Sequence, residues 1–164
     1  MGGVFLFGLE DVWKFIWSFM IVLPLVTLIH ELGHTFFVFI FGGKVKLALG
    51  RGKKLFRIGL VSVHRIYFLD SFIEYSKLKW SNRFTHFFVH AGGIIFNFGS
   101  LFLVNYLVLQ SILPVHTFFY QFAYFSVWFA VFSLLPIDYG DGEYSDGITI
   151  YFVLRYKVFK QLTR

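Results

Sequence analysis

The chain has 164 residues, of which 57% are hydrophobic and 23% aromatic, and 25 residues are phenylalanine. This composition excludes an ordinary soluble domain, and apolar runs of about 20 residues indicate a protein that crosses a membrane several times. The chain has no cysteine, which excludes disulfides and thiolate metal sites. We expect its net charge of +6 to report membrane orientation rather than a nucleic-acid partner.

We predict an all-α polytopic membrane protein in which residues 1–164 form a single domain. Three core transmembrane helices are expected at about residues 14–41, 87–112 and 117–135. The first is roughly 40 Å long at 1.5 Å per residue, enough to cross a bilayer with tilt or with a kink near Pro24. The helices are expected to end at Gly42-Gly43, Pro114 and Pro136. A further segment at 148–162 is amphipathic and too charged at its end to be predicted as a span.

A different pattern separates the first two spans, over residues 44–68. Polar and apolar side chains alternate at the start of Lys44–Leu49 (Lys-Val-Lys-Leu-Ala-Leu), a Gly-Arg-Gly turn follows, and the next residues include several Val and Ile. This pattern predicts a small β-hairpin at the membrane surface. The alternative is a plain basic loop beside anionic lipid.

Lys and Arg are concentrated in two parts of the chain. Ten of the fifteen lie between Gly43 and Phe84 and four follow Gly147, whereas the short connection at 113–116 has none. By the positive-inside rule, the hairpin and the C-terminus then lie in the cytoplasm and the N-terminus lies outside. We expect an integral, multi-pass protein of the cell membrane with this orientation.

The first span contains the motif His30-Glu31-Leu32-Gly33-His34. Titratable groups are costly within a bilayer, so a cluster of three there indicates function. Residues four apart share one face of a helix, which allows His30 and His34 to hold one Zn²⁺. In this spacing Glu31 acts as the general base that takes a proton from water at the metal.

A catalytic zinc site needs a third protein ligand, because it usually has three and a water molecule. No acidic residue occurs from Tyr75 to Ile137, and four then follow within nine residues: Asp138, Asp141, Glu143 and Asp146. After Pro136, Asp146 begins a segment that can start a helix, and a helix start would hold its carboxylate still. Asp141, by contrast, lies between two glycines. We predict Asp146 as the ligand, with Asp141 as the alternative and a solvated acidic loop as the non-functional interpretation.

Two further features of the second span carry weaker signals. His86 and His90 are also four residues apart, but no glutamate accompanies them, so we interpret them as ordinary interfacial residues rather than a metal pair. Asn97 is a polar amide within the span. It either bonds a neighbouring helix or contacts the backbone of a substrate.

These motifs resemble the site-2 protease family of intramembrane zinc metalloproteases, over about residues 15–155. The resemblance rests on His30-Glu31-Leu32-Gly33-His34, on Ala91-Gly92-Gly93-Ile94-Ile95-Phe96-Asn97, and on Leu134-Leu135-Pro136-Ile137 followed by Asp-Gly. Two positions depart from the family pattern: Ile94 replaces a proline and Ser133 replaces an asparagine. A basic hairpin between the first two core spans is also similar to the family.

The resemblance implies His30 and His34 as zinc ligands, Glu31 as general base and an aspartate of an Asp-Gly pair as third ligand. The family's usual spacing after the proline favours Asp141. The Ser-Asp-Gly form, associated with small standalone members, favours Asp146.

The expected function is zinc-dependent endoproteolysis of a membrane protein or small peptide precursor within or near the bilayer, with one Zn²⁺ per chain. The hairpin is expected to pair with the substrate, because a scissile peptide must leave its helix to be cut. Two other classes remain as alternatives. A membrane metal transporter would place ligands along a path on several helices, and an inactive scaffold would be expected to lose Glu31 or a ligand first.

Overall fold

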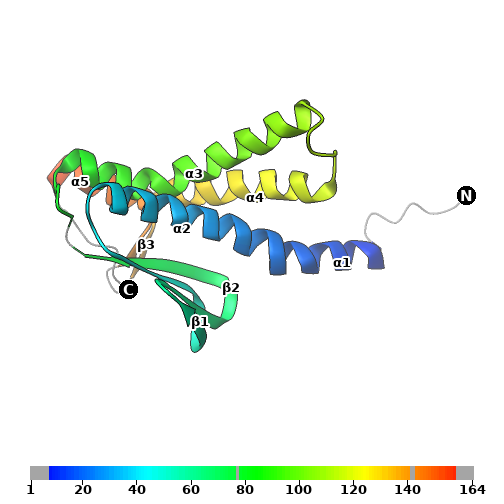
Figure 1. Cartoon of the computed structure of the whole chain (residues 1–164), viewed down its shortest axis with the longest axis horizontal. Helices are drawn as coiled ribbons and strands as arrows, with labels where there is room; N and C mark the ends of the chain where they lie inside the picture. The colour runs from blue at the N-terminus through cyan, green and yellow to red at the C-terminus, as the bar shows by residue number, and fades with distance from the viewer. Residues whose placement is uncertain (1–7, 77, 141–142, 158–164) are drawn as a thin grey trace, which may run out of the picture.

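The structure, a computed structural model, describes residues 8–76, 78–140 and 143–157. Three helical stretches in the described chain are long and apolar enough to cross a membrane: Asp11–Ile40, Arg83–Leu109 and Thr117–Leu134. They lie side by side, with a small sheet against one side of the first (Figure 1). The predicted arrangement of three spans with a sheet between the first and second is therefore present.

The first span is a continuous helix built from three pieces. These are α1 (Leu9–Trp17), the π-helical turn η1 (Ser18–Val22) and α2 (Leu23–Ile40). In η1 the amide of Leu23 donates to the carbonyl of Ser18, five residues back. The wide turn directly precedes Pro24, which has no amide to continue the normal ladder. Gly42, at φ +77°, then ends the helix as predicted.

The sheet between the first two spans is larger than the predicted 44–68. Strand β1 covers Val45–Ile58 and β2 covers Val61–Tyr75, and the two are antiparallel. Both strands bend back on themselves, so that Leu47 pairs with Ile73 on one side and with Val61 on the other. Residues 69–75 place two polar residues and then two apolar residues side by side (Leu-Asp-Ser-Phe-Ile-Glu-Tyr), so a pattern of strict alternation does not extend over them and the sequence prediction stopped too early.

From Tyr67 onward, strand β2 runs in the same direction as the first span, and the two segments are bonded at two points. The amide of Lys79, just after the strand, donates to Phe41 O at 3.0 Å, and the Tyr67 hydroxyl donates to Met20 O at 3.5 Å. Between these points the strand packs against α2 and α3 in an apolar core that includes Val38, Ile73 and Val89. The sheet is thereby fixed beside the part of α2 that carries the His-Glu motif.

The second span, α3, covers Arg83–Leu109, not the predicted 87–112. It starts earlier because the Asn82 side chain accepts hydrogen bonds from the first free amides of the helix, which a hydropathy pattern does not detect. It ends before Pro114, at a turn in which Ser111 has φ +56°. Helices α2 and α3 touch closely at Gly33 and Gly92, where an added Cβ would overlap the backbone of the other helix.

The third span, α4 (Thr117–Leu134), matches the prediction to within one residue. After it the chain forms a small hairpin that was not predicted, with β3 at Asp138–Gly140 and β4 at Glu143–Tyr144. The last described helix, α5, covers Asp146–Tyr156. It starts two residues before the predicted 148–162, and residues 158–162 lie outside the described chain.

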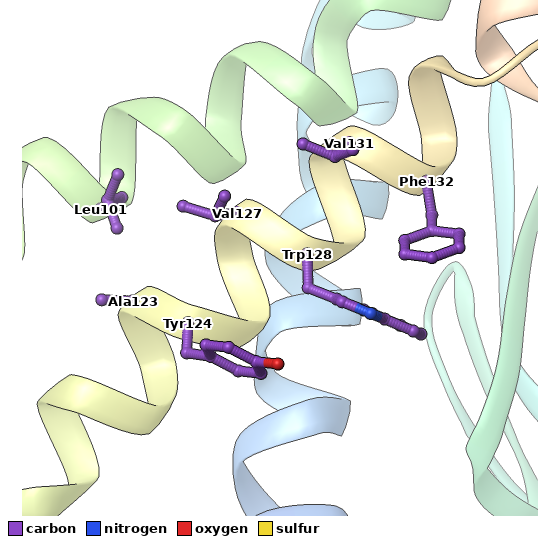
Figure 2. A pocket seen from close by; sticks show the side chains of 7 residues that line it. All are labelled: Leu101, Ala123, Tyr124, Val127, Trp128, Val131 and Phe132. Carbon is purple, nitrogen blue, oxygen red and sulfur yellow. The ribbon is translucent and has the colours of Figure 1, made fainter.

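An apolar groove of about 470 Å³ lies on the outer side of α4, where Leu101 of α3 meets the row from Ala123 to Phe132 (Figure 2). Its lining side chains are aliphatic or aromatic, and the rings of Trp128 and Phe132 are tilted against each other by 39° with centroids 4.5 Å apart. Such a surface suits the acyl chains of a bilayer. It contains none of the His or acidic side chains discussed below.

Candidate metal centre

Three side chains from two distant parts of the chain converge at one point. Nε2 of His30 lies 3.0 Å from Oδ2 of Asp146, and Nε2 of His34 lies 3.5 Å from the same oxygen. The ligand-type atoms of the three all lie within 4.8 Å of one another, and each histidine is only 3% exposed. The structure thus brings together the three residues that the sequence predicts as metal ligands. Zinc binding itself stays a prediction.

The positions of the two histidines follow from helix packing. They are one turn apart on α2, with ring centroids separated by 4.7 Å. Helix α3 covers them with Gly93, where any Cβ would overlap the ring of His30. On the opposite side, the Phe129 ring of α4 packs edge-on against His30 at 4.8 Å. The small residues of α3 therefore leave room for imidazoles between tightly packed helices.

Asp146 is held at the site by the start of α5. Ser145 caps this helix, accepting a hydrogen bond from the Ile148 amide at 3.3 Å, and its hydroxyl donates to Leu135 O. Gly147 lies so close to the end of α4 that a Cβ there would overlap the carbonyl of Leu134. The first residue of α5 is thus fixed against the last turn of α4, as predicted from the helix-start signal.

The far nitrogen of each imidazole is also bonded. Nδ1 of His34 lies 2.7 Å from Val89 O, and because a carbonyl only accepts, that nitrogen carries a proton. In the neutral ring Nε2 then keeps its lone pair toward Asp146, the arrangement that metal-binding histidines normally have.

Nδ1 of His30 lies 3.2 Å from the Asn97 amide, so Asn97 bonds the neighbouring helix, one of its two predicted roles. Oδ1 of Asn97 is buried without a partner. Oxygen and nitrogen of an amide are interchangeable in assignment. With the amide turned, Oδ1 accepts the Nδ1 proton of His30, and the Nε2 lone pair is then free for a metal.

The donor set and its spacing fit Zn²⁺. Tetrahedral ligands at about 2.0–2.2 Å from zinc lie roughly 3.3–3.6 Å apart, and Nε2 of His30 and of His34 lie 3.0 and 3.5 Å from Oδ2 of Asp146. Burial by itself raises the pKa of Asp146, but the adjacent His34 and His30 rings hold that pKa well below its usual range. A carboxylate between two imidazoles is the histidine and carboxylate set of many hydrolytic zinc sites.

Glu31 lies next to this group without belonging to it. Its side chain is buried, and its Oε1 accepts a hydrogen bond of 2.8 Å from the hydroxyl of Ser71 on β2. Glu31 is thus buried beside the three side chains and bonded through one oxygen, and its role as a general base stays a prediction.

The weaker sequence candidates lie elsewhere. His86 is bonded to hydroxyls, with Ser81 Oγ at 3.0 Å and Tyr75 Oη at 3.5 Å, and burial raises the pKa of the Tyr75 phenol. Neither His86 nor His90 joins a metal-type cluster in the described chain. Asp138 is exposed and accepts a hydrogen bond from the amide of Gly140 at 2.9 Å. Asp141 lies outside the described residues.

Two serines at the site were not predicted as functional. Ser71 bonds Glu31, and Ser133 donates to Oδ2 of Asp146. Ser133 was noted only as a departure from the resembled family's asparagine. Ser71 lies beyond the predicted hairpin. The sequence signal that could have found it is its spacing, since it lies two residues before Ile73 and so on the same face of the strand.

No protein-family model matches the sequence. The chain is similar to a protein of Bacillus subtilis (strain 168) described as "Uncharacterized membrane protein YwmF". The two are 51% identical over 151 residues, which cover 92% of this chain and 95% of the relative. The relative's description agrees with the three apolar helices, and the chain is a membrane protein.

Proposed function

The chain belongs to the family of the membrane protein YwmF, and we propose that it is a zinc-dependent endopeptidase embedded in the membrane. Its substrate is a membrane protein or a small peptide precursor, cut within or near the bilayer. The observation that carries the proposal is the buried convergence of His30, His34 and Asp146 with Glu31 beside them.

Each residue has one role in this proposal. His30, His34 and Asp146 would hold the metal, which would supply Lewis acidity to a peptide carbonyl and to the attacking water. Glu31 accepts the proton of that water and later passes it to the leaving amine. Asn97 and the carbonyl of Val89 orient the two imidazoles from behind.

The cost of the site supports a functional interpretation over a structural one. Buried histidines and acids between apolar helices are unfavourable unless they are paired or used, and a well-packed apolar cluster would stabilise the fold at least as well. Within the described chain, the metal-type side chains gather at one point rather than along a path through the spans. A single point favours catalysis over metal transport.

The sheet offers a surface for an unwound substrate. It lies along the first span at the level of Glu31, and a peptide in extended form can add to a strand edge by main-chain hydrogen bonds. The proposal keeps the expected orientation, with the sheet and C-terminus in the cytoplasm, because the basic residues lie on those segments.

The test uses the full chain purified in detergent and reconstituted in lipid nanodiscs. Metal content is measured by elemental analysis, and cleavage of a panel of single-span membrane peptides is followed by mass spectrometry. We expect one zinc per chain and cleavage that stops on treatment with a chelator and returns with zinc. Absence of a bound transition metal after growth in zinc, or cleavage that resists the chelator, would refute the proposal.

A further inference from the structure

The face of β2 that turns toward the helices carries one row of alternate residues. Ile73 and Tyr75, which are 2% and 4% exposed, belong to the core between the sheet and the helices. Ser71 is the next member of this row toward the site and is 8% exposed. A strand that continued only this core would have an apolar side chain there.

The hydroxyl of Ser71 reaches the candidate general base. It donates to Oε1 of Glu31 at 2.8 Å, and both side chains are buried. A hydrogen bond from a neutral donor to a carboxylate is stronger than one between neutral groups, and it fixes one oxygen in direction. Oε2 is then the oxygen left to receive a proton.

The position of Ser71 is set by the sheet rather than by a flexible loop. Ser71 pairs with Leu49 of β1 in the antiparallel register. On either side of it, β2 and the residues after it are fastened to the first span, at Tyr67 with Met20 and at Lys79 with Phe41. Any shift of the strand along α2 therefore moves the hydroxyl relative to Glu31.

We propose that Ser71 is a positioning residue for Glu31, through which the β1–β2 sheet sets the direction of the general base. The inference rests on the proposed function, since it gives Glu31 a catalytic task. It makes the sheet part of the site: a peptide held on the sheet and the base that acts on it share one rigid support. The contact contributes to the rate without touching substrate or metal.

The kinetic test compares Ser71→Ala, Ser71→Thr and a matched control, Ser62→Ala. Ser62 lies on the same strand, but its hydroxyl donates to Leu47 O within the sheet. We expect Ser71→Ala to lower kcat about tenfold, in the range typical for partners behind an active-site residue, with KM and zinc content unchanged. Ser71→Thr should recover most of the rate because it keeps the hydroxyl, and Ser62→Ala should retain wild-type kcat. An unchanged kcat in Ser71→Ala, or an equal loss in Ser62→Ala, would overturn the inference.

A second measurement needs neither substrate nor metal. In chelator-treated protein, thermal unfolding is compared for the wild type, Ser71→Ala, Glu31→Ala and the double variant. If the two side chains are coupled, Ser71→Ala lowers the unfolding temperature by a few degrees when Glu31 is present and not when it is absent. Equal shifts in both backgrounds would contradict the contact. The coupling could be present although neither the wild type nor any variant cleaves peptides. In that case the proposed function would fail and the Ser71–Glu31 contact would stand.

Discussion

The hydroxyl of Ser133, in the last turn of α4, donates a hydrogen bond to Oδ2 of Asp146, the first residue of α5. This contact joins residues thirteen positions apart, so the carboxylate returns to the helix end from which the loop departs. The same oxygen lies 3.0 Å from Nε2 of His30 and 3.5 Å from Nε2 of His34. Ser133 therefore supports the candidate ligand from behind, the role that partners of metal ligands commonly have.

Removing the hydroxyl of Ser133 should weaken the metal site without abolishing it. We expect Ser133→Ala to lower zinc affinity about 10- to 100-fold, the usual cost of losing a partner behind a ligand. Ser133→Asn, which restores a donor, should lose less. Competition with a chromophoric chelator gives the affinities, and equal zinc affinity in Ser133→Ala and wild type would contradict this role.

Glu31→Gln should keep zinc and lose proteolysis. Glutamine keeps the size and one acceptor oxygen, so the bond from Ser71 can persist, but it cannot accept the proton. Loss of a general base costs about 10²–10⁴ in rate. Zinc content and cleavage are measured on the same preparation, and near-wild-type cleavage by this variant would refute the mechanism.

His30→Ala and His34→Ala should each lose both zinc and activity. Each change removes one of three protein ligands and leaves Asp146 with one imidazole. His86→Ala is the matched control, because His86 bonds Ser81 and Tyr75 away from the site. A stoichiometry of one zinc per chain in both ligand variants would place the metal elsewhere.

The third ligand is tested by Asp146→Asn, Asp141→Asn and Asp138→Asn. Asp146→Asn is expected to empty the site, because an amide is a poor zinc ligand and because Asp146 faces both histidines. Asp138→Asn should have the least effect, since that side chain is exposed and bonded within its own turn. Asp141→Asn is expected to reduce activity only in part. If Asp141→Asn alone released the zinc, Asp141 would be the ligand.

The orientation in the membrane is tested by single cysteines, which the native chain lacks. Ser62→Cys, in the sheet, should resist a membrane-impermeant thiol reagent in intact cells and react after lysis. Val115→Cys, in the short connection between α3 and α4, should react in intact cells. The reverse labelling would invert the positive-inside assignment and place the sheet outside.

The sequence by itself determined the features that depend on local patterns. Hydropathy and helix stop signals located three spans, and the His30-Glu31-x-x-His34 spacing placed two imidazoles on one face of a helix, because helical period is a local property. A helix start beside Asp146 was also expected from local signals, although the segment was predicted from residue 148 and the cap at Ser145 starts α5 at Asp146. The boundary errors have local causes as well: Asn82 starts α3 within a polar stretch that a hydropathy pattern leaves out.

The tertiary structure decided which distant groups meet. The approach of Asp146 to His30 spans 116 positions of sequence, and it depends on Gly147 and Gly93 allowing backbones and rings to come into contact. The strands β1 and β2 fold back on each other, and Leu47 of β1 pairs with β2 on both of its sides. The contact of Ser71 with Glu31 depends on this arrangement. These relationships arise from the packing of surfaces far apart in the chain, and a periodic pattern within one segment carries no information about which surfaces will pack together.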